Sequence, residues 1–258
     1  MDLYEPARFL HIGIGTVVLA AFWTAALARK GSAPHRRAGR AYVVAMAALL
    51  GVTLVMSAGM VRAGTPLRAV FDVYVTLISV ASVWMAWNSV RHRHAIDRYL
   101  GWPYRVICLL LGGYALFLLA LVPKMGAPAR MAMVSAFAVL GLAIAAAMAW
   151  RWLRRDDHPR WWLSEHLTAM AVNFAATHAS FSILAGGSIF PMLKEPWIRT
   201  AILAAWMLSA LAVRLRARRW LAYDEPGRRA SRSISTLAPR ANPVTPMQVR
   251  AGRRSAAK

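Results

Sequence analysis

The sequence predicts an all-α fold, a polytopic bundle of about seven transmembrane helices. Hydrophobic residues make up 59% of the 258-residue chain and charged residues only 16%, whereas a soluble domain carries roughly a quarter charged residues. Most of the chain lies in apolar runs near the ~20 residues that cross about 30 Å of hydrocarbon as a helix. We expect a transmembrane domain over residues 1–222, followed by a basic, disordered cytoplasmic tail over 223–258 that is rich in Ser, Pro and Arg.

Seven apolar runs follow one another through short connections, and six spans remain an alternative because the fourth and seventh runs are short. Pro66, Pro103, Pro128, Pro159 and Pro196 fall in connections or at helix starts, where a missing N–H does least harm. The last helix should continue to about residue 223, because no breaker precedes residue 226. The expected spans are 9–28, 41–61, 69–90, 106–122, 131–150, 167–190 and 197–213.

The distribution of positive charge predicts the orientation of these spans. Segments 29–40, 91–105 and 151–160, together with the chain beyond residue 213, hold 25 of the 32 Lys and Arg. Cationic loops stay in the cytoplasm, so the amino terminus is expected outside and the carboxyl terminus inside. The net charge of +22 is therefore explained mainly by the orientation of the spans in the membrane. The lipid bilayer and its anionic headgroups are the expected partners, and no nucleic acid is expected.

Histidines inside the spans are candidates for function, because polar side chains in lipid are costly to keep. His11 lies in the first span, with Gly15 one turn below it. His178 shares a face of the sixth span with Ala171 and Ala175, which points it into the bundle. Both imidazoles are expected in the outer half of the membrane. Such a pair can hold haem b or a transition metal; the alternative for His11 is an interfacial residue wetted by headgroups.

Polar residues also form rows along two of the spans. In the third span Asp72, Thr76 and Ser79 share a face near the outer surface, where the Asp72 carboxylate could orient His11 or pair with Arg68. Such rows either bind helices to one another or line a path for water, protons or a ligand. The row in the sixth span consists of His166, Asn173, Thr177 and Ser180.

The start of the second helix is a candidate site for an anionic group. Its amide N–H groups and guanidinium groups could receive a phosphate or carboxylate, including a lipid headgroup or a haem propionate. The alternative is a positive-inside anchor with an interfacial tyrosine. The residues concerned are His35, Arg36, Arg40 and Tyr42.

Several classes of protein are excluded by what the spans lack. No lysine lies within a span, which excludes a retinal Schiff base. A P-loop, a zinc-protease His-Glu-x-x-His motif and a nucleophile elbow are all missing from the sequence. Arginines around His92, His94 and Asp97 repel cations, so no metal site is expected there. The single cysteine, Cys108, lies in an apolar run as a small hydrophobe.

Three short motifs resemble a family of bacterial predicted membrane proteins, domain of unknown function 2306. The resemblance covers roughly residues 9–190, while Arg37 and the basic tail lie outside its pattern. It implies a multi-pass protein of the bacterial cytoplasmic membrane and supplies no activity. The motifs are His11-x-x-x-Gly15, His35-Arg-x-x-Gly39-Arg40-x-Tyr42, and Glu165-His166 followed by His178.

Three kinds of function remain open on the sequence alone. The first is a haem- or metal-binding redox component that uses His11 and His178. The second is a small-solute transporter or permeation protein built on the polar row of the sixth span. The third is a non-catalytic assembly or sensor component of the membrane, and whether the protein is an enzyme stays undecided.

Overall fold

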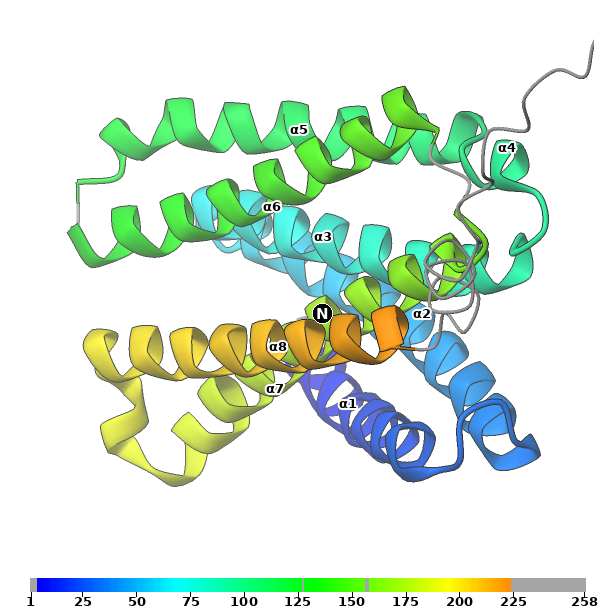
Figure 1. Ribbon diagram of the computed structural model, residues 1–258. Helices are drawn as coiled ribbons and strands as arrows, with labels where there is room; N and C mark the ends of the chain where they lie inside the picture. Colours follow the sequence, from blue (N-terminus) through cyan, green and yellow to red (C-terminus); the bar gives the residue numbers. More distant parts are fainter. Residues whose placement is uncertain (1–3, 127, 156–157, 224–258) are drawn as a thin grey trace, which may run out of the picture. The chain divides into compact units, whose positions relative to one another are not determined.

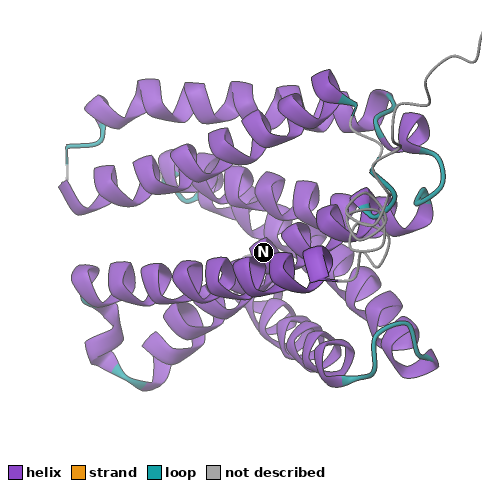
Figure 2. Ribbon diagram, in the orientation of Figure 1, coloured by secondary structure: helices purple, strands orange, loops and turns teal. Residues whose placement is uncertain are grey.

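The computed structural model describes residues 4–126, 128–155 and 158–223, and every regular element in these ranges is a helix (Figures 1 and 2). This confirms the all-α prediction. A short helix, α4, and two 3-10 turns, η1 and η2, interrupt the connections. The elements are α1 (Tyr4–Leu27), α2 (Ala33–Arg62), α3 (Pro66–Arg91), α4 (Ile96–Tyr99), α5 (Trp102–Leu121), η1 (Val122–Lys124), α6 (Pro128–Arg154), α7 (Trp161–Ile189), η2 (Pro191–Lys194) and α8 (Pro196–Tyr223).

Six of these helices, α1, α2, α3, α5, α6 and α8, are long and apolar enough to cross a membrane. The chain therefore has the make-up of a multi-pass membrane protein. α7 covers the sixth expected span but is not among the six. From residue 161 to residue 179 none of its side chains is exposed. A helix shielded by its neighbours does not need a lipid-compatible surface, so α7 can carry several polar residues.

Prolines stand at helix starts as expected from the sequence, and glycines occupy two of the turns. Pro66, Pro128 and Pro196 are the first residues of α3, α6 and α8, where the N–H that proline lacks would have no partner inside the helix. Gly31 and Gly64 adopt φ values of 78° and 74° in the turns before α2 and α3. Only glycine adopts this conformation without steric cost, which allows both turns to be short.

α3 lies at the centre of the packing and contributes buried residues to three apolar clusters, one of which holds Met85 and Ala86 with Tyr99 and Tyr104. Tyr74 and Ile78 pack with Leu111 of α5 and Val134 of α6. Val83 belongs to another of these clusters, which joins α3 to α1 and α2. The α1–α2 hairpin and the α5–α6 hairpin therefore meet through α3, which also packs against α7.

The α3–α6 contact is close because a glycine faces a tyrosine. The Tyr74 ring is fully buried, and its hydroxyl donates to the Ala138 carbonyl of α6 at 3.5 Å. A Cβ atom on Gly141 would lie 1.8 Å from the Tyr74 hydroxyl oxygen. Similar bonds from side chains to helix carbonyls join α5 to α6 and to α3: Tyr104 to Met148 (3.0 Å), Cys108 to Ala145 (3.3 Å) and Tyr114 to Val70 (2.9 Å).

α8 is a helix of 28 residues that ends at Tyr223, so the expected continuation of the last span is confirmed. Ala210 packs in a small cluster with Ala171 and Ala175 of α7, flanked by Trp206. Most of the described α8 side chains are exposed or half-buried, as suits a helix surrounded by lipid. The basic tail beyond residue 223 lies outside the described residues.

Candidate functional site at the helix ends

His11 lies at the α1–α2 interface and not in a ligand pocket of its own. Its Nδ1 is 3.2 Å from the Thr53 hydroxyl oxygen. That hydroxyl donates to the Leu49 carbonyl at 2.9 Å, so the imidazole is the donor in the contact with Thr53. Gly15, one turn further along α1, faces the Leu49 side chain. The close approach expected at Gly15 is therefore made by α2.

His178 is enclosed by aromatic rings and is only 8% exposed. Its Nε2 accepts a hydrogen bond of 2.9 Å from the Trp23 indole, and its Nδ1 donates to the Phe174 carbonyl at 2.8 Å. The ring centroids of Phe22 and Trp206 lie 5.6 Å and 4.8 Å from the imidazole. Both ring nitrogens are thus engaged, and His178 joins α1, α7 and α8.

The structure does not bring His11 and His178 together. Trp23, which contacts His178, lies three helical turns beyond His11 on the same helix, about 18 Å along its axis. His178 therefore meets the part of α1 near Leu27 and not the end that carries His11. The expectation that both imidazoles lie at a similar depth in the membrane holds only if α1 and α7 run parallel to each other. In the structure α1 crosses α7 at Phe22 and Phe174, whose stacked rings have centroids 5.8 Å apart.

The four polar side chains of the α7 row point to different neighbours: two contact α3, one faces α2 and one is exposed. His166 donates from Nδ1 to the Ala86 carbonyl of α3 at 2.8 Å. Asn173 is fully buried and accepts a 3.0 Å hydrogen bond from the Ser82 hydroxyl of α3. Thr177 faces Tyr42 of α2, and Ser180 is exposed. Three of the four predicted residues are thus brought to helix interfaces, and Ser180 is not.

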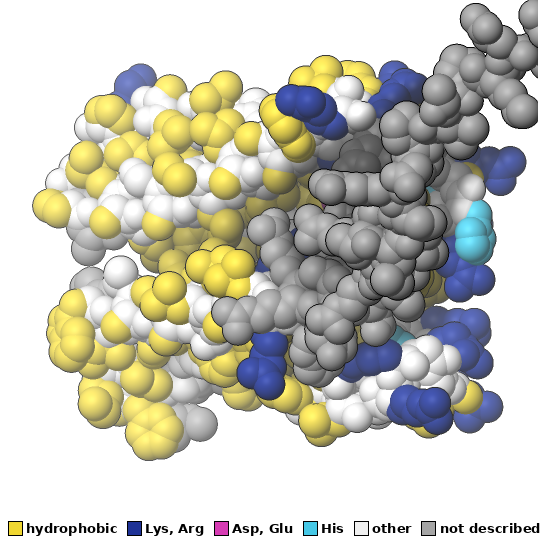
Figure 3. Space-filling view, viewed as in Figure 1, with side chains coloured by type: hydrophobic (Ala, Val, Ile, Leu, Met, Phe, Trp, Pro, Cys, Tyr) yellow, Lys and Arg dark blue, Asp and Glu magenta, His cyan; other side chains and the backbone are white. Residues whose placement is uncertain are grey.

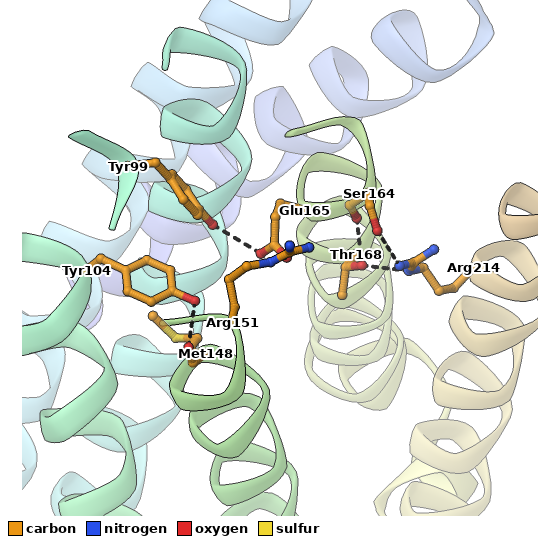
Figure 4. A network of polar contacts seen from close by, with 8 residues as sticks. All are labelled: Tyr99, Tyr104, Met148, Arg151, Ser164, Glu165, Thr168 and Arg214. Atoms are coloured by element: carbon orange, nitrogen blue, oxygen red, sulfur yellow. Dashed lines mark hydrogen bonds and ion pairs between the residues drawn. The ribbon is translucent and has the colours of Figure 1, made fainter. Parts of the chain in front are cut away.

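A partly buried carboxylate, that of Glu165, lies where α4, α6 and α7 meet (Figure 4); the sequence singles it out only as part of the Glu165-His166 motif. Glu165 accepts from Arg151 Nε at 3.0 Å and from the Tyr99 hydroxyl at 3.1 Å. The carboxylate and guanidinium side chains are 14% and 16% exposed. Burial, and then the negative charge of Glu165, raise the pKa of Tyr99 well above its usual value. The Tyr99 phenol therefore stays a hydrogen-bond donor at physiological pH.

The opposite side of the first turns of α7 is bound to α8 by a second arginine (Figure 4). Arg214 donates to the Thr168 hydroxyl at 2.6 Å and to the Ser164 hydroxyl at 2.9 Å. Ser164 is adjacent to Glu165, so α7 is held by α6 on one side and by α8 on the other. A signal for this arrangement was present in the sequence, because Glu165 is the only acidic residue between positions 158 and 194.

The predicted anion-binding set at the start of α2 divides into two pairs. His35 donates from Nδ1 to the Ala25 carbonyl at 2.9 Å, and so caps the end of α1. Tyr42 is buried beside Phe22, with ring centroids 5.9 Å apart. Neither residue faces an external ligand. Among the described residues, the lining of an open hollow on this helix consists of Ala33, Arg36, Arg37 and Arg40.

Arg37, which lies outside the family pattern, is therefore part of the hollow together with the predicted Arg36 and Arg40. All three arginines are exposed. Arg36 also donates to the Gly31 carbonyl, which orients its guanidinium over the turn before α2. Ser32 caps the helix by accepting from the His35 amide at 3.4 Å. The first turn of α2 adds the positive end of the helix dipole to the three cations.

Six helices that are long and apolar enough to cross a membrane give the chain the make-up of a helical membrane protein. No protein-family model, curated protein or solved structure matches the chain. The resemblance to domain of unknown function 2306 stays a prediction. Within the described ranges no three His, Cys, Asp or Glu side chains gather as a protein metal site would require.

Proposed function

We propose that the protein is a seven-span, non-catalytic component of the bacterial cytoplasmic membrane whose cytoplasmic face binds the phosphate groups of anionic lipids. α7 would be the seventh span, with the amino terminus outside and the carboxyl terminus in the cytoplasm. The family resemblance supports the bacterial membrane. The hollow lined by Arg36, Arg37 and Arg40 is the observation that carries the lipid interaction.

The orientation is supported by where the basic residues fall on the helices. The α1–α2 turn, the α3–α5 connection with α4, and the α6–α7 connection all lie at one set of helix ends, and each is rich in arginine. Figure 3 shows Lys and Arg side chains gathered at the end of the bundle that carries α4, while hydrophobic side chains dominate the helix flanks. This pattern is typical of a cytoplasmic face.

The geometry favours this proposal over the two other functions considered. A redox centre built on His11 and His178 loses support, because the imidazoles lie apart and both nitrogens of His178 are hydrogen-bonded within the chain. A solute path along the whole α7 row loses support as well, because Ser180 is exposed away from Asn173. The three exposed arginines that line the hollow, in contrast, suit a phosphate diester.

The orientation is tested with single cysteines in a Cys108→Ala background. Ala63 and Arg29 are exposed in the connections on opposite sides of the proposed membrane. A membrane-impermeant maleimide added to intact cells should label Ala63→Cys, and it should label Arg29→Cys only after lysis. Labelling of Arg29→Cys in intact cells would contradict the orientation.

Lipid binding is tested by titrating the purified protein with phosphatidylglycerol, and with phosphatidylcholine as the uncharged comparison, in native mass spectrometry. Each basic residue near anionic lipid contributes about 1 kcal/mol. Replacing Arg36, Arg37 and Arg40 by Gln should therefore weaken phosphatidylglycerol binding roughly a hundredfold. The matched control replaces Arg91, Arg93 and Arg98, three exposed arginines at the same helix ends. Equal losses in the two triple variants would show that general surface charge, and not the hollow, binds the lipid.

A further inference from the structure

Two hydroxyl groups on α2 and α7 have no hydrogen-bond partner among the residues that the structure describes. Tyr42 of α2 is 2% exposed, and its hydroxyl oxygen and that of Thr177 on α7 are both buried. The two hydroxyls face each other but do not meet the geometry of a direct hydrogen bond. Both therefore point to one place between α2 and α7.

The Thr177 hydroxyl is turned away from the bond that threonines commonly make inside a helix. A helical threonine can donate to the carbonyl of the residue four positions earlier. In this chain that bond, at 2.7–3.0 Å, is made by Thr16, Thr24, Thr53, Thr76 and Thr168. Thr177 does not make it to the Asn173 carbonyl. The orientation of Thr177 toward Tyr42 thus points to a partner that replaces the bond within the helix.

The surroundings of the two hydroxyls restrict what such a partner can be. The Phe22 ring of α1 lies 5.9 Å from the Tyr42 ring, measured between centroids, and Tyr42 shares an apolar cluster with Met46, Met170 and Phe174. A charged ligand would have to leave water for these apolar surroundings, which is costly. Two hydroxyls together offer both donors and acceptors. They suit a small neutral ligand that itself donates and accepts hydrogen bonds.

A water molecule meets these requirements. It can donate to one hydroxyl and accept from the other, and the Asn173 carbonyl, one turn before Thr177, keeps a lone pair as a third partner. Buried waters typically make about three hydrogen bonds to polar groups that the chain leaves unsatisfied. One water would thus remove the penalty of leaving two buried hydroxyls unpaired.

We infer that a single water molecule is bound between α2 and α7 by the hydroxyls of Tyr42 and Thr177. α2 packs mainly against α1 and α3, so this water is a polar link from α2 to α7. It helps to fix the helix whose first two turns carry the arginines of the hollow. The water site goes beyond the lipid binding proposed above, and it rests on different residues.

The experiment is hydroxyl-radical labelling of the purified full-length protein in mild detergent. Short X-ray pulses turn water into radicals that oxidise the side chains beside it, and mass spectrometry measures the labelling rate of each residue. Tyr104 is the internal comparison, because it is 0% exposed and its hydroxyl donates to the Met148 carbonyl at 3.0 Å. Tyr42 should be labelled severalfold faster than Tyr104, although both rings are buried. Thr177→Val, which removes one of the two hydroxyls, should lower the rate at Tyr42 to that at Tyr104.

Two control variants separate the water site from general effects of substitution. Thr177→Ser keeps the hydroxyl and should keep fast labelling of Tyr42. Thr16→Val removes an exposed hydroxyl that is bonded within its own helix and should leave the rate at Tyr42 unchanged.

The comparison of Tyr42 with Tyr104 is made within the native protein, so it tests the inference even if a substitution disturbs the fold. A native rate at Tyr42 no higher than that at Tyr104 would overturn the inference, because the two hydroxyls would then be dry or bonded directly to each other. Fast labelling of Tyr42 that persists in Thr177→Val, or an equal loss in Thr16→Val, would overturn it as well.

Discussion

Replacing Gly141 by alanine is expected to destabilise the contact between α3 and α6 specifically. The new Cβ would stand 1.8 Å from the Tyr74 hydroxyl oxygen and 2.7 Å from the ring carbon that bears it. Both distances are far below van der Waals contact. The Tyr74 ring is fully buried, so it cannot move aside without displacing its neighbours or pushing the two helices apart.

The size of the effect follows from three contributions. Overpacking of this kind costs about 1–3 kcal/mol. Displacing the ring also breaks the long hydrogen bond from Tyr74 to the Ala138 carbonyl, which contributes about 1 kcal/mol or less. The higher helix propensity of alanine relative to glycine stabilises the folded state by about 1 kcal/mol. We therefore expect a net loss of about 1–3 kcal/mol in the free energy of unfolding.

The assay is reversible unfolding of the purified protein in mixed micelles of a mild detergent and SDS, followed by tryptophan fluorescence. Gly113→Ala is the matched control, because no heavy atom lies within 4 Å of a Cβ at that helical position. The control should be neutral or slightly stabilising. Adding Tyr74→Phe to Gly141→Ala should restore part of the loss, since it removes the closest atom. Equal stabilities of Gly141→Ala and Gly113→Ala would refute the proposed packing.

The remaining predictions concern the contacts of Glu165, the Tyr99 hydroxyl and the single thiol. Glu165→Gln leaves the largely buried guanidinium of Arg151 without its carboxylate and should cost about 3 kcal/mol; adding Arg151→Met should recover most of that loss in the same unfolding assay, and no recovery would argue against the ion pair. The raised pKa of Tyr99 means that the folded chain keeps a proton which the unfolded chain releases above about pH 10. Native stability should therefore fall as the pH rises beyond that value, and Tyr99→Phe should show a shallower fall; identical slopes would contradict the buried phenol. The buried Cys108 should react with a maleimide far more slowly in mild detergent than in SDS, and equal rates would show that α5 is not packed as described.

The helices could be predicted from the sequence because each is specified locally. Apolar runs of sufficient length, with Pro66, Pro128 and Pro196 at helix starts, determine where helices begin and which segments can enter lipid. The continuation of α8 to Tyr223 followed from the same local reasoning. The polar side chains of α7 also stand out in the sequence as rare residues in an apolar run.

The partners of those side chains could not be predicted, because they depend on how the helices cross. His178 meets Trp23 and not His11, since α1 is inclined across α7. Glu165 finds Arg151 and Tyr99 only because α4 and α6 end beside the first turns of α7. Helical periodicity gives the direction of a side chain about its own axis, but it carries no information on tilt or on neighbours that are distant in sequence.

During synthesis, α3 emerges well before the helix that covers its polar face. Roughly 70 residues separate Arg91 from Trp161, which at about 5–20 residues per second takes ~4–14 s. In that interval Thr76 and Ser79 donate to carbonyls of their own helix, so α3 can enter lipid with these hydroxyls already satisfied. The hydrogen bond from Ser82 to Asn173 forms only later, when α7 has been synthesised. A nascent chain halted before α7 would thus be inserted in the membrane with one face of α3 not yet covered by protein. The packing of α7 against that face is the step that completes the helix bundle.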